Sequence, residues 1–331
     1  MLHPEPLTGQ VVSARFPMPM VPEGWYAVAR SSAVRAGKIV SLNYFSKALI
    51  AYRGRDGVAT VRDAHCPHYG AHLGVGGKMV DGTVECPFHG WRFDAQGKCT
   101  VAPFAPRAPK VTLRGYPTAE HSGLIFAYIG GQGAPQWNVP AIPEATAREY
   151  ASPIVDVSTA RIHIQEMREN IVDESHFHYI HRQAEPPQIV LETNGPVAYV
   201  KSRIARTVAG IHVDNSFDAD MYGPGVMVVR TQGRFFSMTA LALTTPIDAE
   251  RSEMTMLYYV RKPRGAALAL TPLLKLIFRI SAFKEVHHEV AIWDNKIHRA
   301  KPILLPHEQG IRALRQWYQQ FYPPADQLDG A

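Results

Sequence analysis

Short apolar runs separated by turn-forming residues fill the first third of the chain. Runs at 38–42, 48–52, 58–62 and 124–129 are rich in aliphatic and aromatic residues, and Gly, Asp and Pro residues separate them. Runs of this length between such turn signals are typical of β-strands. The pattern therefore predicts a small all-β domain, which we place at residues 24–135.

The hydrophobic pattern changes after a stretch rich in Gly and Pro at 130–143, which we interpret as a linker. Apolar and aromatic positions with helical spacing follow through 162–179. Alternation of apolar and polar residues then predicts an antiparallel sheet with one face in water. The five strand-like runs of that sheet lie at 197–207, 211–219, 225–231, 234–245 and 254–261.

Two helical segments close the chain, at 282–297 and 307–321, and Pro323 and Pro324 end the second. We therefore predict the α+β fold class, in which the small all-β domain is followed by a second domain at 145–325. The second domain would contain the antiparallel sheet and helices that cover it.

The composition is that of a globular protein with a sizeable core. The 331 residues suffice for two domains, with 46% hydrophobic and 19% charged residues. The formal net charge is +6, but Lys and Arg are scattered along the sequence. This distribution favours a solvated surface over a site for an acidic partner, and it indicates no nucleic-acid-binding surface.

Several features bear on location in the cell. Three cysteines, two of them in metal-ligand spacing, point to a reducing cytoplasm, and the N-terminal residues lack the pattern of a signal peptide. The most apolar stretch, 266–280, is interrupted by Pro272, Lys275 and Arg279 and is too short to cross a bilayer. We interpret it as a helix packed in the core, with a helix that covers a pocket or touches a membrane surface as the alternative.

Two loops carry the strongest chemical signal. Cys66 and His68 form a C-x-H group, seventeen residues follow, and Cys86 and His89 form a C-x-x-H group. Each loop supplies one thiolate and one imidazole, so one iron can take both sulfurs and a second iron both nitrogens, as in a Rieske [2Fe–2S] cluster. A tetrahedral zinc site is the alternative, but zinc fingers keep cysteines and histidines in separate groups.

A second constellation follows the linker. Asn170, Asp173 and His176 are spaced three apart, which places them on one face of the predicted helix, and His181 lies about one turn further on. Two imidazoles and one carboxylate form the facial triad of non-haem Fe(II) oxygenases, which leaves metal positions open for O2. His178 falls on a different face of that helix and is left out of the site.

Both motifs resemble those of Rieske non-haem iron oxygenases. The similarity includes residues 90–94 after the second loop and the whole N-x-x-D-x-x-H-x4-H string. Rieske subunits of respiratory complexes carry an additional cysteine in each loop, whereas Tyr69, Gly70 and Ala71 follow His68 here. Cys99 has no partner and is interpreted as an incidental small residue.

The resemblance implies a third, acidic iron ligand. In related monooxygenases it is usually an Asp three residues before Ile or Val and four before Trp, and that register falls on Glu289. The side chain here is longer by one methylene, so Glu285 and Asp294 stay open as competitors. His287 and His288 are expected to be structural rather than ligands.

The C-terminal residues narrow the resemblance. Residues 293–296 and 311–322 are similar to 3-ketosteroid 9α-hydroxylase oxygenase components and the related cholesterol desaturases. The resemblance, which covers residues 25–322, implies a homotrimeric terminal oxygenase with a mononuclear Fe(II) that uses O2. It also implies electrons from NAD(P)H through a ferredoxin, a flavin reductase or both. Asp173 would bridge His176 to His89 of a neighbouring subunit, and Asn170 would assist at the iron.

The substrate is less well defined by the sequence. A hydrophobic small molecule, steroid-like or polycyclic, is implied by the resemblance, and a wall for it could come from apolar residues, although a plain core would look the same. N-oxygenation, desaturation or oxidative cyclisation of a natural product is the alternative reaction, and a Rieske protein that only transfers electrons is the alternative from another class. The candidate wall residues are Met221, Val226, Met227, Phe235, Phe236 and Met238.

Overall fold

The computed structural model describes residues 13–131, 134–183, 186–208, 211–232, 237–263 and 265–323. Contacts within the chain divide it into two compact units. The smaller unit comprises Trp25–Asn138, and the larger comprises Met1–Gly24 together with Val139–Ala331. The chain therefore begins in the larger unit, forms the smaller one, and then returns.

The smaller unit is built from short antiparallel strands in three sheets, with the orders β1-β11-β10, β2-β3-β4-β9 and β5-β6-β7-β8. All six residues of β11 are buried, so this strand lies in the core. The strands are β1 (Gly24–Arg30), β2 (Ile39–Tyr44), β3 (Lys47–Arg53), β4 (Ala59–Asp63), β5 (Lys78–Val80), β6 (Thr83–Glu85), β7 (Arg92–Phe93), β8 (Cys99–Val101), β9 (Gly115–Tyr116), β10 (Thr118–His121) and β11 (Leu124–Ile129).

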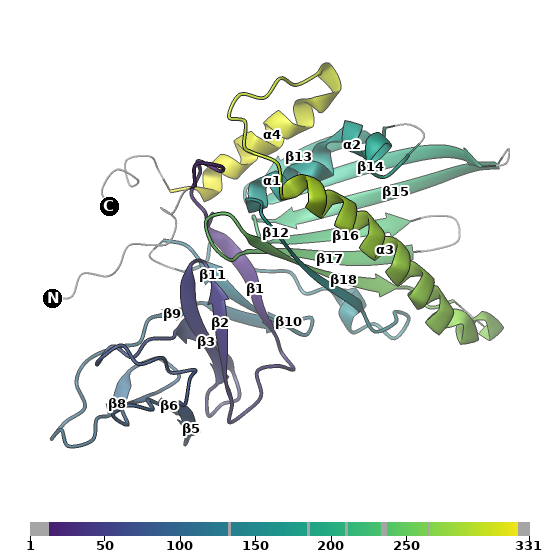
Figure 1. Cartoon of the computed structure of the whole chain (residues 1–331). Coiled ribbons are helices and arrows are strands. Elements are labelled where there is room, and N and C mark those ends of the chain that lie inside the picture. Colours follow the sequence, from purple (N-terminus) through teal and green to yellow (C-terminus); the bar gives the residue numbers. More distant parts are fainter. Residues whose placement is uncertain are drawn as a thin grey trace. The chain divides into compact units, whose positions relative to one another are not determined.

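The larger unit contains one antiparallel sheet of seven strands in the order β12-β18-β17-β16-β15-β14-β13 (Figure 1). Apart from β12, which pairs with β18, each strand pairs with its neighbour in sequence, so short connections suffice. The strands are β12 (Ile154–Ala160), β13 (Gln188–Asn194), β14 (Val197–Val208), β15 (Ile211–Tyr222), β16 (Val226–Gln232), β17 (Ser237–Pro246) and β18 (Ser252–Val260).

Helices cover one face of this sheet, which we call the inner face. It is defined by Tyr258 of β18 and Ala240 of β17, which pack with Phe278 and Phe283 of the long helix α3. Figure 1 shows α3 lying across the strands. The helices are α1 (Ile164–Glu169), α2 (Glu174–Tyr179), α3 (Thr271–Trp293) and α4 (Gln309–Tyr318), with short 3-10 turns at Pro143–Ala145, Asn170–Val172, Gly265–Leu270, Pro306–Glu308 and Gln319–Phe321.

Residues 13–24 are held by the C-terminal part of the larger unit. The N–H of Glu23 donates to the carbonyl of Phe321 at 2.6 Å, and the N–H of His298 donates to the carbonyl of Arg15 at 3.1 Å. Phe16 is fully buried in the cluster that contains Trp293 of α3. These contacts explain why the first residues belong to this unit, which no sequence pattern indicated.

The predicted helix at 162–179 is wrong in one respect, because the structure breaks it at Asp173. This residue is extended (φ −87°, ψ 99°) and caps α2, its side chain accepting from the N–H groups of Ser175 and His176. Asp stabilises a helix more as its N-cap than in its interior. Asn170, Asp173 and His176 therefore do not share one helix face.

Helix α3 begins at Thr271, eleven residues before the predicted start at 282. Pro272, which we took as an interruption, lies in the first turn, where a proline loses no intrahelical hydrogen bond. The interpretation of 266–280 as a core-packed helix holds only in part: Phe278 packs against the core of the sheet, whereas Leu273, Leu276 and Ile280 are each more than half exposed. No helix in the described part of the chain is both long and apolar enough to cross a membrane.

The α+β class is confirmed, with a small all-β unit and a larger antiparallel sheet with covering helices. The sequence analysis missed β12 and β13. Strand β12 includes Asp156, which is uncommon in strands, and β13 is an edge strand that follows Pro186 and Pro187.

Candidate metal centres

Two loops of the smaller unit have the same backbone structure. In the first, the N–H of Gly70 donates to the carbonyl of Cys66 at 2.9 Å, and the N–H of Cys66 donates to the carbonyl of the residue after Gly70, also at 2.9 Å. In the second, the corresponding bonds join Gly90 to Cys86 at 3.1 Å and Cys86 to the residue after Gly90 at 2.8 Å. Both glycines have positive φ (78° and 69°), which other residues rarely adopt. The matching sequence motifs therefore fold into matching turns.

The two loops bury their sulfurs and expose their imidazoles. Cys66 and Cys86 are 2% and 3% exposed, whereas His68 and His89 lie at the surface with ring centroids 4.7 Å apart. Burial raises the pKa of the Cys66 thiol to about 11, and the neighbouring Cys86 adds to that, while the N–H groups of the turn act in the opposite direction. A cationic metal would displace this proton, because the thiolate is the form that binds metal.

The ring of Trp91 lies against one of the exposed imidazoles. It stacks on His68 with a centroid distance of 4.3 Å and an interplanar angle of 5°. This contact fixes the orientation of an otherwise exposed ring, which an exposed metal ligand requires.

The donor atoms of these loops do not suit a single ion. Among the described residues, one group of three or more His, Cys, Asp or Glu has its ligand atoms within 4.8 Å of one another, and the loop residues do not form it. Ligands of one tetrahedral ion must be mutually close. Two sulfurs on the buried side and two imidazoles on the exposed side are the arrangement expected of a centre with two metal atoms.

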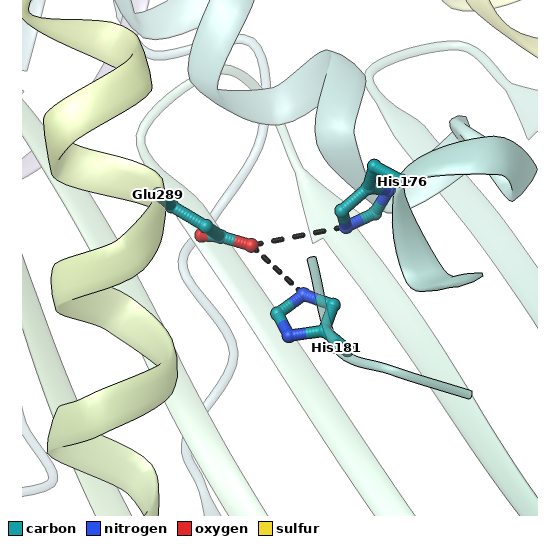
Figure 2. A group of neighbouring side chains, drawn as sticks. All are labelled: His176, His181 and Glu289. Carbon is teal, nitrogen blue, oxygen red and sulfur yellow. Dashed lines mark hydrogen bonds and ion pairs between the residues drawn. The ribbon is translucent and has the colours of Figure 1, made fainter. Parts of the chain in front are cut away.

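The group that does converge is His176, His181 and Glu289 in the larger unit. Glu289 Oε1 lies 3.0 Å from His181 Nε2 and 3.7 Å from His176 Nε2. Figure 2 shows the carboxylate directed from α3 toward both rings. The side chains of His176, His181 and Glu289 are 10%, 19% and 15% exposed, so the group is sheltered from water yet accessible.

The backbone holds His176 in one tautomer. Its Nδ1 lies 2.6 Å from the carbonyl oxygen of Asp173. A carbonyl only accepts, so Nδ1 carries the hydrogen and Nε2 keeps its lone pair toward Glu289. Burial, the largest cause, lowers the pKa of His176 and so favours the neutral ring that binds a metal.

The other predicted residues lie around this group. The Asp173 carboxylate caps α2, and its Oδ2 is 4.0 Å from His176 Nδ1. Asn170 lies in the turn between α1 and α2 and is half-buried. His178 is exposed, and its Nδ1 lies 2.7 Å from the carbonyl of Gln183, away from the group.

Of the two competitors for the third, acidic ligand, Asp294 lies apart from the group. Asp294 Oδ1 accepts from the N–H of Arg161 at 2.7 Å and does not join the group. The side chain of Glu285 lies outside the described residues. Of the candidate wall residues, Met221, Met227 and Met238 lie on the inner face, Val226 lies on the opposite face by strand alternation, and Phe235 and Phe236 are not described.

A buried charged network around α1 was not predicted from the sequence. Glu166 is fully buried and pairs with Lys296 at 2.6 Å and with His298, and Arg315 of α4 forms two bonds of 2.8 Å to Glu169. Burial opposes the charge of Glu166, but the His298 hydrogen bond and Lys296 lower its pKa to about 2. The network anchors the segment that leads into α2. Its only sequence signal was two acidic residues directly before the predicted motif.

Comparison with known families defines the protein. The Rieske [2Fe-2S] domain model matches residues 24–117, and the 3-ketosteroid 9alpha-hydroxylase C-terminal domain model matches residues 130–322. A Rieske domain joined to that catalytic domain defines a Rieske oxygenase, and this confirms the predicted class of cluster. The chain belongs to the 3-ketosteroid 9α-hydroxylase family. It is an oxidoreductase, the terminal oxygenase component of a multicomponent system, which uses O2 and takes electrons from a reductase or ferredoxin.

Two relatives are similar to this chain over most of its length. A cholesterol 7-desaturase of Ciona intestinalis is 27% identical over 92% of this chain and 73% of its own length. The oxygenase component of a 3-ketosteroid-9-alpha-monooxygenase from Mycolicibacterium smegmatis is 28% identical over 90% of this chain and 82% of its own length. The two relatives therefore differ in the reaction for which they are named.

Solved structures share the fold. Dicamba monooxygenase bound to dicamba superimposes with a TM-score of 0.74 at 18% identity, covering 90% of this chain and 96% of that one. The NdmA QL mutant of Pseudomonas putida CBB5 with caffeine gives a TM-score of 0.75 at 16% identity, with 89% of each chain covered. At these identities the likeness concerns the fold alone.

Proposed function

We propose that His176, His181 and Glu289 hold a mononuclear Fe(II) at which this chain oxidises an apolar substrate. The observation that carries the proposal is the convergence of two imidazoles and one carboxylate within 4.8 Å. Such a donor set would leave coordination positions of a bound iron free for O2. Because the Asp173 carbonyl fixes the tautomer of His176, the lone pair on Nε2 of that ring faces Glu289.

The four loop residues would hold the [2Fe–2S] cluster, Cys66 and Cys86 on one iron and His68 and His89 on the other. The buried sulfurs would keep one side of the cluster away from water, and the exposed imidazoles would form its accessible side. When bound, the cluster supplies single electrons and the mononuclear iron supplies O2 activation. The chain's own groups would position both, and burial together with the Asp173 carbonyl favours the neutral, metal-binding form of His176.

Asp173 would connect the two centres between subunits of a homotrimer. Its Oδ1 is occupied by two backbone N–H groups of α2, and its half-exposed carboxylate keeps Oδ2 near His176 Nδ1. An exposed His89 from a neighbouring subunit could donate to such a carboxylate. Asn170, one turn earlier, would assist at the iron. Because the thiols must stay reduced, the cytoplasm is the proposed location.

The substrate we propose is a bulky hydrophobic molecule of the steroid or polycyclic type. The inner face that leads to Glu289 presents Met221, Met227 and Met238 beside small alanines, a surface that can accommodate a large apolar body. Named relatives act on cholesterol or on 3-ketosteroids, which supports this class. Hydroxylation is the main reaction, and desaturation is the second candidate because desaturases are among the relatives.

The test compares His176→Ala with His178→Ala in the reconstituted system, with a generic ferredoxin and reductase and a panel of steroids. We expect His176→Ala to keep the visible spectrum of the cluster, lose one iron per chain, and lose turnover by about 1,000-fold or more. His178→Ala, on the same helix but bonded to Gln183, should keep all three.

Product mass distinguishes the reactions. A gain of one oxygen indicates hydroxylation, and a loss of two hydrogens indicates desaturation. Full turnover by His176→Ala, or wild-type iron content in that variant, would show that the iron site lies elsewhere.

A further inference from the structure

The inner face of the large sheet carries one charged side chain among those described. Alternate residues on this face in six of the seven strands are apolar, small or hydroxyl-bearing, except for Asp156 of β12. The segments concerned are 154–160, 198–202, 217–221, 227–231, 238–244 and 254–260.

Asp156 lies in a row of otherwise apolar residues that runs across five neighbouring strands. It pairs with Met256, and the row continues through Ala242, Met227 and Met221. Two of the candidate wall residues of the substrate space are thus in register with this carboxylate. The opposite end of the face carries Phe217, whose ring centroid is 5.1 Å from that of Phe177 beside His176.

The carboxylate is covered by α3. Ile154, two residues before Asp156, packs with Phe278 and Phe283, and Ala160 packs with Val286. Asp156 itself is 8% exposed, and its Oδ2 is buried without a hydrogen-bond partner within the described part of the chain. A buried carboxylate oxygen without a hydrogen-bond partner is costly and persists where something else stabilises it.

Asp156 and Glu289 both lie near enough to the phenol of Tyr258 to act on it. Burial is the main cause that raises the pKa of Tyr258, and the charges of Asp156 and Glu289 raise it further. Both carboxylates therefore act on the same phenol, which lies on the inner face and contacts Phe278 of α3. The two acids flank one region of this face, with Glu289 toward the histidines and Asp156 at the β12 edge.

We propose that Asp156 anchors a hydrogen-bond donor, a hydroxyl or an ammonium, on an otherwise apolar polycyclic substrate. This inference rests on the proposed function. It adds which polar group of the substrate is recognised, a point that the proposed function leaves open. A carboxylate accepts hydrogen bonds, so it recognises a hydroxyl and disfavours a ketone in the same place. The anchor fixes one end of a rigid ring system at β12 and sets which carbon reaches the iron held by Glu289.

The first experiment measures binding to the holoenzyme by quenching of tryptophan fluorescence. The probes are a 3β-hydroxysteroid, its 3-ketone and its 3β-amine, which differ at one position only. We expect the wild type to bind the hydroxyl or amine probe about 10- to 100-fold more tightly than the ketone. Asp156→Asn should reduce this preference to about threefold or less, and preference for the amine over the alcohol would identify the donor as an ammonium.

Ser158→Ala is the matched control, since Ser158 is the next inner-face residue of β12 and carries no charge. It should keep the wild-type order of probes. An unchanged order in Asp156→Asn, with donors still preferred, would overturn the anchor.

The second experiment does not depend on any substrate. Removing an unpartnered buried charge should stabilise the ligand-free protein, so Asp156→Leu is expected to raise its thermal midpoint by about 2–4 °C. A lowered midpoint would show that Asp156 has a structural partner and would overturn the proposal.

The proposed function and the anchor fail in different ways. If the probes bind in the expected order but wild-type enzyme converts none, the reaction is wrong and the anchor stands. If the wild type converts them and Asp156→Asn keeps the same preference, the anchor is wrong and the reaction stands. If no steroid binds, both the proposed substrate class and the anchor are wrong.

Discussion

The two candidate metal centres are constructed in opposite ways. The loop centre comes from two turns twenty residues apart, each closed by its own backbone hydrogen bonds. The helix centre joins His176 and His181 to Glu289, more than a hundred residues later, and depends on α3 crossing the sheet. The loop centre is therefore determined locally, whereas the helix centre exists only when the larger unit is folded. The following predictions test that difference.

Loss of one loop thiolate should have the largest effect. Cys86→Ala removes a ligand whose sulfur cannot be replaced by water, so we expect loss of the visible cluster spectrum and a fall in turnover of about 1,000-fold or more. Metal binding at His176, His181 and Glu289 should continue, which Fe(II) or Co(II) titration of the purified variant would measure. Cys99→Ala is the control and should behave as the wild type; loss of metal from both centres in Cys86→Ala would contradict their independence.

Removal of the distant ligand should affect only the helix centre. Glu289→Ala leaves two imidazoles, and we expect the affinity for Fe(II) to fall by about 100-fold or more with the cluster spectrum intact. Glu289→Asp should lie between the two because its carboxylate is one methylene shorter. Asp294→Asn, next to the same helix end, should bind metal normally, and weak binding by that variant instead would return Asp294 to the list of ligands.

Acid should unfold the larger unit through residues that it buries. Burial lowers the pKa of His163 to about 4, below the unfolded value near 6.5. The unfolded state then binds more protons, so the stability contributed by neutral His163 is present above pH 6.5 and is lost as pH falls toward 4. The loss is on the order of 3 kcal/mol.

Glu166 extends the acid effect to lower pH. Its pKa is lowered to about 2 in the folded chain, so its contribution is lost as pH falls from about 4.5 toward 2. Chemical denaturation followed at several pH values would measure both windows. His163→Asn should flatten the dependence between pH 6.5 and 4, and an unchanged slope there would exclude His163 as its origin.

Loss of the α2 cap at Asp173 should give the smallest change in stability. Substitutions at this residue distinguish its structural role from a role in catalysis. Asp173→Ala removes the cap of α2 and should cost about 1 kcal/mol, whereas Asp173→Asn should keep it. If the charge also orients His176 and a neighbour's His89, both variants should lose turnover by about 10- to 100-fold. Normal turnover by Asp173→Asn would reduce Asp173 to a structural cap.

The sequence was most informative where the functional residues lie close together along the chain. Cys66, His68, Cys86 and His89 could be selected because loop spacing and turn residues lie within 25 positions. His176 and His181 were found in the same way, and Glu289 only through a register. The break at Asp173 was missed because helical periodicity does not reveal that a side chain prefers to cap. Asp156 was missed because its unusual feature, one charge on an apolar face, appears only once the strands are in register.

Residues 13–24 have a consequence for how the protein is made. Their partners include His298 and Phe321, which are synthesised long after them, so the larger unit cannot be completed until the chain has been made as far as residue 321. The smaller unit has all its strands by residue 138, and its two ends leave from the paired strands β1 and β11. The smaller unit is thus inserted in the sequence of the larger one, with all its strands synthesised before the larger unit can be completed. Removing residues 13–24 would destabilise the larger unit rather than the smaller unit, which they precede in the sequence.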